Sequence, residues 1–115
     1  MKVRLSSAAR SYLRNETAYL RKHSQNGAKS FVKRMKTARE NIGIFSGLGS
    51  ESRELPIPIR NMRRLAIGDY FMDYQIGEDM ITIIAIRSQL QMPMTIVVDE
   101  NVEYENDQWD YTPER

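Results

Sequence analysis

The chain has 115 residues, of which 41% are hydrophobic and 28% charged, so its length and composition suit one domain with a single modest core. It contains no Cys and a single His, His23, which excludes a disulfide scaffold, a thiolate metal site, a cysteine nucleophile and a multi-histidine metal centre. The net charge of +2 is unevenly distributed, because residues 1–64 carry +11 and residues 65–115 carry −9. The basic part could attract a polyanion or an acidic protein surface, or could simply form a solvated helix face.

The sequence gives no sign of a membrane segment or a bound cofactor. Its longest strongly apolar stretch, residues 80–86, is far shorter than the roughly 20 residues that cross a bilayer. The opening MKVRLSSAAR also lacks the apolar run of a signal peptide. We therefore expect a cytoplasmic protein with no membrane partner, no metal and no other cofactor.

The N-terminal residues predict a short strand followed by a helix. Apolar and polar side chains alternate over residues 3–6, which is typical of a strand with one buried face. Ser6 or Ser7 can cap the helix that follows, because a serine hydroxyl accepts one of the free amide protons of the first turn. Helical spacing of apolar residues continues to His23, and the pair Asn26-Gly27 is expected to end this helix and cap the next.

A second helix is better defined and follows after a short link. Lys29, Lys33 and Lys36 lie on one of its faces, while a continuous apolar face is formed by Ala28, Phe31, Val32, Met35, Ala38 and Ile42. Because the link is short, the two helices should form an antiparallel hairpin. Three glycines then interrupt the helical pattern, which predicts a loop over residues 44–53.

The hydrophobic period changes to two after this loop. Pro56 and Pro58 make residues 55–59 an edge or lead-in segment, because proline cannot donate a hydrogen bond to a neighbouring strand. Three strands are then predicted, over residues 62–67, 70–75 and 80–87, with turns at residues 68–69 and 77–79. The last strand is apolar on both faces and should be the most buried, central one. The expected fold is α+β: an N-terminal strand, an antiparallel helical hairpin and a three-stranded antiparallel meander (βααβββ).

The pattern weakens after the last of these strands. Residues 94–98 could form a small extra strand, and residues 99–115 hold seven acids and one Arg. We therefore divide the chain into a domain over residues 1–98 and an acidic C-terminal tail over residues 99–115. Trp109 and Tyr111 in this tail suggest two alternatives, a solvated extension or a segment that folds back onto the basic surface.

Three runs of the sequence carry a resemblance to a known family: the opening VRLSSAARSYL, the run NIGIFSGLGSESRELP after the hairpin, and RNMRRLAIGDYFMDYQIGEDMITIIAIR. With these runs, the chain resembles the RelE/ParE superfamily of bacterial type II toxins over roughly residues 2–90. The basic pair, apolar strand, Gly-Asp-Tyr turn and aromatic-rich strand look like the ParE version. The resemblance implies two helices packed on a twisted antiparallel sheet and a neighbouring antitoxin in a hetero-oligomer. ParE-like members are associated with poisoning of DNA gyrase, and RelE-like members with cutting mRNA on the ribosome.

The available side chains help to choose between these activities. Metal-independent RNA cleavage needs groups that activate the ribose hydroxyl, protonate the leaving oxygen and stabilise the charged phosphorane. Arg63, Arg64 and Arg87 are candidate phosphate-binding catalysts in that case, but no His lies on the predicted sheet. The commoner interpretation of Arg87 is a strand-terminal charge that leaves the core and reaches solvent. Tyr70 and Tyr74 are most simply core residues, since nothing beside either suggests a lowered pKa.

These observations favour a toxin that binds gyrase without substrate turnover and is neutralised by a cognate antitoxin. The alternatives are a RelE-like, ribosome-dependent mRNA endonuclease and a non-toxic basic binding domain. After Arg87 the chain reads SQLQMPM, without the His-Arg-Arg or Lys-Arg cluster common in the family, and it continues for 28 residues. The candidate partner-binding residues are Arg60, Arg63, Arg64, Arg87, Lys29, Lys33, Lys36 and Trp109.

Overall fold

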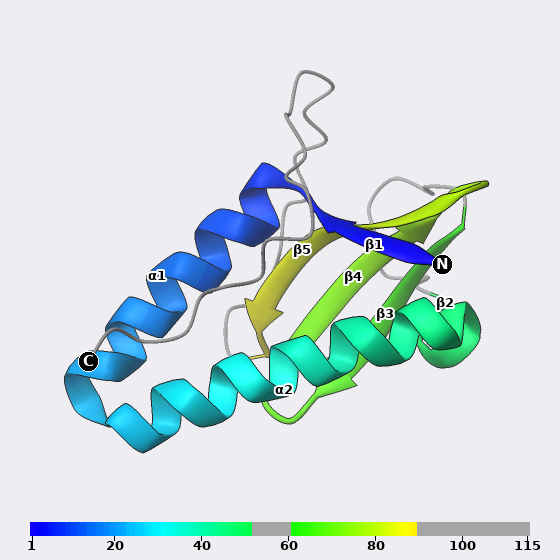
Figure 1. Cartoon of the computed structure of the whole chain (residues 1–115). Coiled ribbons are helices and arrows are strands. Elements are labelled where there is room, and N and C mark those ends of the chain that lie inside the picture. The colour runs from blue at the N-terminus through cyan, green and yellow to red at the C-terminus, as the bar shows by residue number, and fades with distance from the viewer. Residues whose placement is uncertain (52–60, 90–115) are drawn as a thin grey trace.

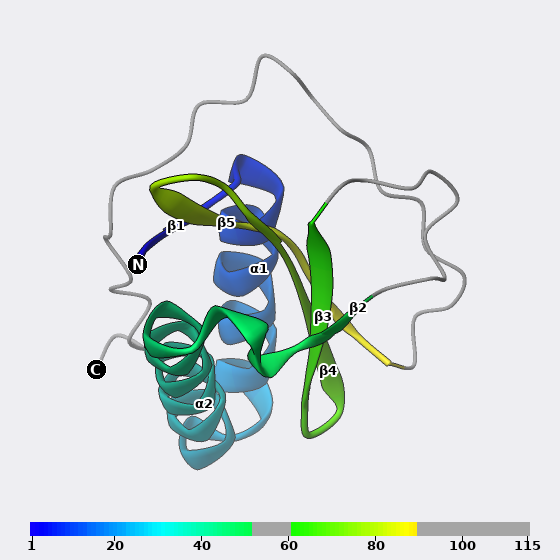
Figure 2. The same cartoon turned by 90° about the vertical axis from the view of Figure 1, so that its right-hand side faces the viewer.

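The computed structural model describes residues 1–51 and 61–89. In chain order its elements are β1 (Lys2–Leu5), α1 (Ser7–His23), α2 (Gln25–Ile44), the 3₁₀ helix η1 (Ser46–Leu48), β2 (Ser50–Glu51), β3 (Met62–Ile67), β4 (Tyr70–Ile76) and β5 (Met80–Ser88). The two helices form a hairpin against one face of a twisted sheet (Figures 1 and 2). The predicted α+β class and element order are confirmed.

The sheet has five strands in the order β1-β5-β4-β3-β2. β1 runs parallel to β5, with Val3 opposite Ile81, while the remaining neighbours are antiparallel. The three strands of the predicted meander are confirmed as β3, β4 and β5. The prediction that the last of them is central is wrong, because β1 joins one side of it and β2 extends the other edge, which makes β4 the middle strand.

Two serines set the ends of the helices. Ser6 caps α1, since its Oγ accepts the Ala9 N–H at 3.0 Å, and the same hydroxyl donates to the Ile84 carbonyl of β5 at 2.7 Å. The expected junction at Asn26-Gly27 is wrong, because both residues lie inside α2. Ser24 takes that role: its backbone is extended, and its Oγ accepts the Gly27 N–H at 2.9 Å.

The predicted loop over residues 44–53 contains more structure than expected. α2 extends through Ile44 and ends where Phe45 adopts extended backbone angles, and η1 and β2 follow. β2 adds to the sheet by pairing Ser50 with Arg64. The segment therefore returns the chain from the helix layer to the edge of the sheet.

The core lies between the helix hairpin and the sheet. The predicted apolar face of α2 is confirmed, since all six of its residues are buried. Tyr70, Met72 and Tyr74 on β4 face these helices and are buried too, as predicted. Three predicted features lie outside the described residues, namely the edge segment 55–59, the strand 94–98 and the tail 99–115.

Candidate functional site

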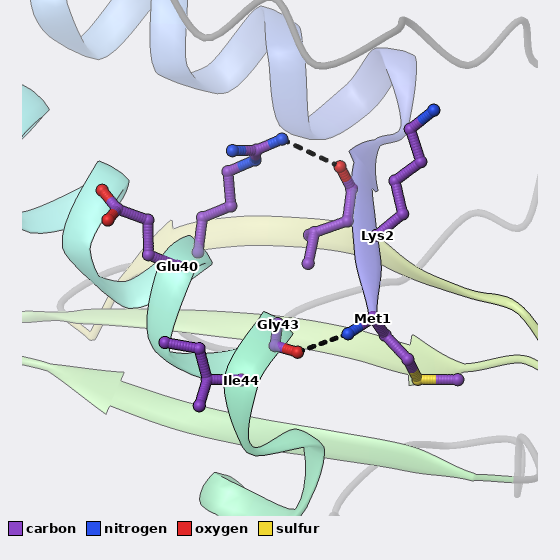
Figure 3. A pocket seen from close by; sticks show the side chains of 7 residues that line it. Met1, Lys2, Glu40, Gly43 and Ile44 are labelled. Carbon is purple, nitrogen blue, oxygen red and sulfur yellow. Dashed lines mark hydrogen bonds between the residues drawn. The ribbon is translucent and has the colours of Figure 1, made fainter.

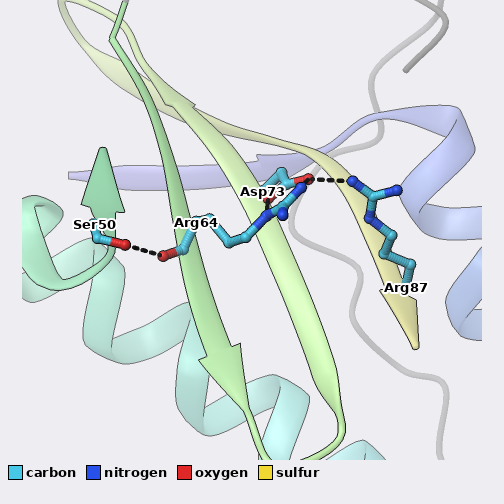
Figure 4. Close-up of polar contacts among 4 residues, drawn as sticks. All are labelled: Ser50, Arg64, Asp73 and Arg87. Carbon is cyan, nitrogen blue, oxygen red and sulfur yellow. Dashed lines mark hydrogen bonds and ion pairs between the residues drawn. The ribbon is translucent and has the colours of Figure 1, made fainter. Parts of the chain in front are cut away.

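A charged cluster lies on the face of the sheet that the helices do not cover. Side chains alternate between the two faces of a strand, so Asp73 points away from the core that contains Met72. The strand register places Arg64 of β3 beside Asp73, and Arg87 of β5 beside Phe71. Arg64, Asp73 and Arg87 therefore meet across three neighbouring strands (Figure 4).

Arg64 holds Asp73 through a two-pronged ion pair. Its Nε lies 2.7 Å from Oδ1 and its Nη2 lies 3.1 Å from Oδ2. The Asp73 side chain is completely buried and that of Arg64 is 12% exposed. The guanidinium also lies 4.7 Å from the centre of the Phe71 ring, a cation–π contact. Two hydrogen bonds and a flat aromatic surface fix the orientation of this arginine.

Arg87 approaches the same carboxylate from the other side. Its Nη2 lies 3.5 Å from Asp73 Oδ2, and its side chain is 6% exposed. The prediction that Arg87 leaves the core for solvent is therefore wrong. A guanidinium can stay buried at this position because a carboxylate on the neighbouring strand offsets its charge. Among the described residues, the cluster is thus a shielded patch in which two guanidinium groups pair with the Asp73 carboxylate.

Arg63 does not belong to this cluster. It is the strand neighbour of Arg64 and lies opposite Tyr74 on the helix-facing side of the sheet. Its Nη1 donates to the Gly49 carbonyl at 2.6 Å, which ties β3 to the segment after η1. The three arginines proposed as catalysts are therefore split between the two faces of the sheet.

Tyr74 connects the middle of the sheet to η1. Its hydroxyl donates to the Ser46 carbonyl at 2.7 Å and accepts the Gly49 N–H at 2.8 Å. Burial raises the pKa of Tyr74 above its ordinary value, although the Gly49 hydrogen bond opposes this shift. At neutral pH the phenol is a fixed structural donor, and the burial of Tyr74 confirms its predicted place in the core.

Tyr70 and Tyr12 lie beside Glu16, the only charged residue on the apolar stripe of α1. The Tyr70 hydroxyl donates to Glu16, which explains how α1 tolerates a carboxylate on its inner side. Burial, followed by this hydrogen bond, raises the pKa of Tyr70 strongly, and burial raises that of Tyr12 to about 12. Neither phenol is suited to release or take up a proton near neutral pH.

The remaining predicted site residues are dispersed. Lys29 and Lys33 are exposed on α2 and Lys36 is half-buried there, in line with the predicted basic face. His23 ends α1 and its ring contacts that of Tyr19 at a tilt of 54°, with 4.6 Å between ring centres. Figure 1 places this end of the hairpin away from the sheet. Arg60 and Trp109 lie outside the described residues.

An open cavity of about 410 Å³ lies where β1 meets the end of α2 (Figure 3). Two hydrogen bonds cross it: the Met1 ammonium donates to the Gly43 carbonyl at 2.6 Å, and Arg39 Nη2 donates to the Val3 carbonyl at 3.3 Å. The polar groups of this cavity thus fasten the edge strand to the helix. Their contacts explain the local packing of β1.

A comparison with protein-family models identifies the fold. Residues 3–93 match the ParE toxin of the type II toxin-antitoxin system parDE. The chain belongs to the ParE toxin family. The match covers β1 through β5, and with them the cluster around Asp73. No curated protein matches the chain.

Membership in the ParE family implies a ParD-type antitoxin as the partner of this toxin. Within residues 1–51 and 61–89, no group of three or more His, Cys, Asp or Glu side chains could hold a metal ion. No helix in this described part of the chain is long and apolar enough to cross a membrane.

Sequence reasoning identified Arg64 and Arg87 in this ParE-family toxin but missed Asp73. The alternation of residues 70–75 puts Asp73 on the strand face opposite Tyr70 and Tyr74, and no role is predicted for it there. The available signal was the small number of charged residues in three largely apolar strands, namely Arg63 and Arg64 in β3, Asp73 in β4 and Arg87 in β5. Only the register, which sets Arg64 directly opposite Asp73, turns that pattern into a buried ion pair.

Proposed function

We propose that this ParE-family toxin inhibits DNA gyrase by binding it, without chemical turnover of a substrate. The observation that most supports binding is the position of the three arginines that were candidate catalysts. Arg64 and Arg87 are oriented by Asp73, and Arg63 is on the other face of the sheet. A nuclease would also need a proton donor and acceptor beside its cations.

The acid–base groups described above do not meet that need. Tyr12, Tyr70 and Tyr74 all have raised pKa values, which disfavours proton transfer by their phenols near pH 7. His23 lies at the far end of the helix hairpin from the sheet. Gyrase as the target follows from the association of ParE-like members with that enzyme.

For the antitoxin, the α2 face that carries Lys29, Lys33 and Lys36 is the surface we assign to an acidic ParD segment. Lys29 and Lys33 are exposed, and the surrounding part of the chain is strongly basic. Summed positive charge accelerates the approach of an acidic partner and makes association sensitive to salt. The single variants Lys29→Glu and Lys33→Glu should each slow association with ParD, while Arg14→Glu on α1 provides the control with the same charge change.

The function is tested by two assays run in parallel on toxin that has been separated from its ParD-type antitoxin. We expect loss of gyrase supercoiling, restoration by added antitoxin, and intact mRNA in a translating extract. Site-specific mRNA cleavage that disappears in Arg87→Ala would instead support a RelE-like endonuclease. Normal growth on induced expression would contradict toxicity and leave a basic binding domain.

A further inference from the structure

The outer face of the sheet, opposite the helices, is rich in arginine. Its side chains include Arg4 on β1, whose Nε donates to Thr82 Oγ1 at 3.2 Å, as well as Arg64 and Arg87. Asp73 is the only carboxylate that the described residues of β1, β3, β4 and β5 place on this face. The face therefore has an excess of positive charge over four neighbouring strands.

This outer face is shielded although both described helices pack on the other side (Figure 2). Asp73 is 0% exposed and Arg87 is 5% exposed, and charged residues are rarely buried to this extent unless they are paired. Charged side chains on an open sheet face would normally extend into water. Asp73 and Arg87 instead stay close together, joined by their ion pair.

We propose that the acidic segment 99–115 of the same chain docks on the outer face. It carries seven carboxylates against one Arg, which complements the arginine excess, and it contains Trp109. Isolated surface ion pairs contribute little, so an aromatic ring stacked on a guanidinium supplies the apolar contact. Phe71 already makes such a contact with Arg64 on this face.

The connection is long enough for this arrangement. β5 ends at Ser88, one residue after Arg87, so the chain continues from the arginine-rich cluster itself. Residues 90–98 can span up to about 30 Å when extended. The distance from β5 to β3 is only about 10 Å, because neighbouring strands lie about 4.8 Å apart. Covalent attachment also gives the segment a high effective concentration at the face.

Docking of the tail would cover Arg64 and Arg87. The acidic segment would then compete with any anionic surface of a target or antitoxin that approaches this side of the sheet. Removal of the tail by a partner exposes the arginines without a change in the fold. This consequence rests on the proposed function, whereas the intramolecular contact itself does not and can be tested without gyrase.

The chain suits a contact assay because it has one Trp and no Cys. Bimane attached to Thr82→Cys on the outer face should be quenched by contact with Trp109. The control label at Lys29→Cys, on exposed α2, should remain bright. We expect the quenching at position 82 to disappear when Trp109→Phe is added and to weaken at high salt. Equal emission with and without Trp109→Phe would overturn the proposal.

Two further measurements cover the other outcomes. Quenching within one molecule is independent of protein concentration. Quenching that grows with concentration would instead show that the tail of a second copy contacts the outer face, and would overturn the assignment. The unmodified full chain provides a readout that needs no substitution. We expect Trp109 to be partly protected from acrylamide at low salt and more accessible at high salt. Full accessibility at low salt would contradict docking even if a labelled variant failed to fold.

Discussion

Tyr74→Phe tests how the sheet holds the segment after α2. The change removes one oxygen and leaves the buried ring in place, so no large cavity forms. It removes the hydrogen bonds to the Ser46 carbonyl and from the Gly49 N–H, and leaves that buried amide without its partner. An unmade buried hydrogen bond costs about 1–3 kcal/mol, so we expect the free energy of unfolding to fall by about 2–3 kcal/mol.

Urea unfolding followed by circular dichroism measures this change. Because the free energy of unfolding changes by about 1–3 kcal/mol per molar urea, the midpoint should fall by about 0.7–3 M while the slope stays constant. Tyr19→Phe is the control, because Tyr19 is 58% exposed and its loss should change stability by less than about 0.5 kcal/mol. Hydrogen exchange at the Gly49 amide should also accelerate. A midpoint shift no larger than that of Tyr19→Phe would refute the reasoning.

Three other predictions concern charge, pH and helix capping. Asp73→Asn removes the carboxylate that pairs with two shielded guanidinium groups and should lower the free energy of unfolding by about 3–5 kcal/mol in urea, whereas an effect below about 1 kcal/mol would show that the pair is solvated. Burial raises the pKa of Tyr12 to about 12 and that of Tyr70 still higher, so folding favours the protonated phenols. Their contribution is complete below about pH 10, the unfolded value, and is lost as pH rises through 12; alkaline melts should show this decline, less steeply in Tyr70→Phe. Ser24→Ala removes the acceptor of the Gly27 N–H and should cost about 1 kcal/mol by thermal melting, and an unchanged melting temperature would argue against the cap.

Local patterns predicted most of the fold of this ParE-family toxin. The apolar spacing of α2 identified its buried face, and alternation identified Tyr70, Met72 and Tyr74 as core residues. The junction between the helices was misplaced because Ser24 and Asn26-Gly27 are both good capping sequences. The structure selects Ser24, whose extended backbone ends one helix and starts the next.

Long-range pairing explains what the sequence could not predict. β1 pairs with β5, nearly 80 residues later, and no local feature of residues 2–5 specifies that partner. The same limit applies to the candidate site: whether Arg87 reaches solvent or is buried depends on which residue of β4 lies beside it. Burial of Asp73 is therefore a property of strand register.

Binding without turnover is the central claim, and a stoichiometric titration tests it most directly. Gyrase at fixed concentration is incubated with increasing amounts of the toxin, and supercoiling is measured at several times. Inhibition by binding predicts that activity falls until toxin and gyrase sites are equal and does not change with longer incubation. Progressive loss of activity at toxin amounts far below those of gyrase, or no inhibition at any ratio, would contradict the account.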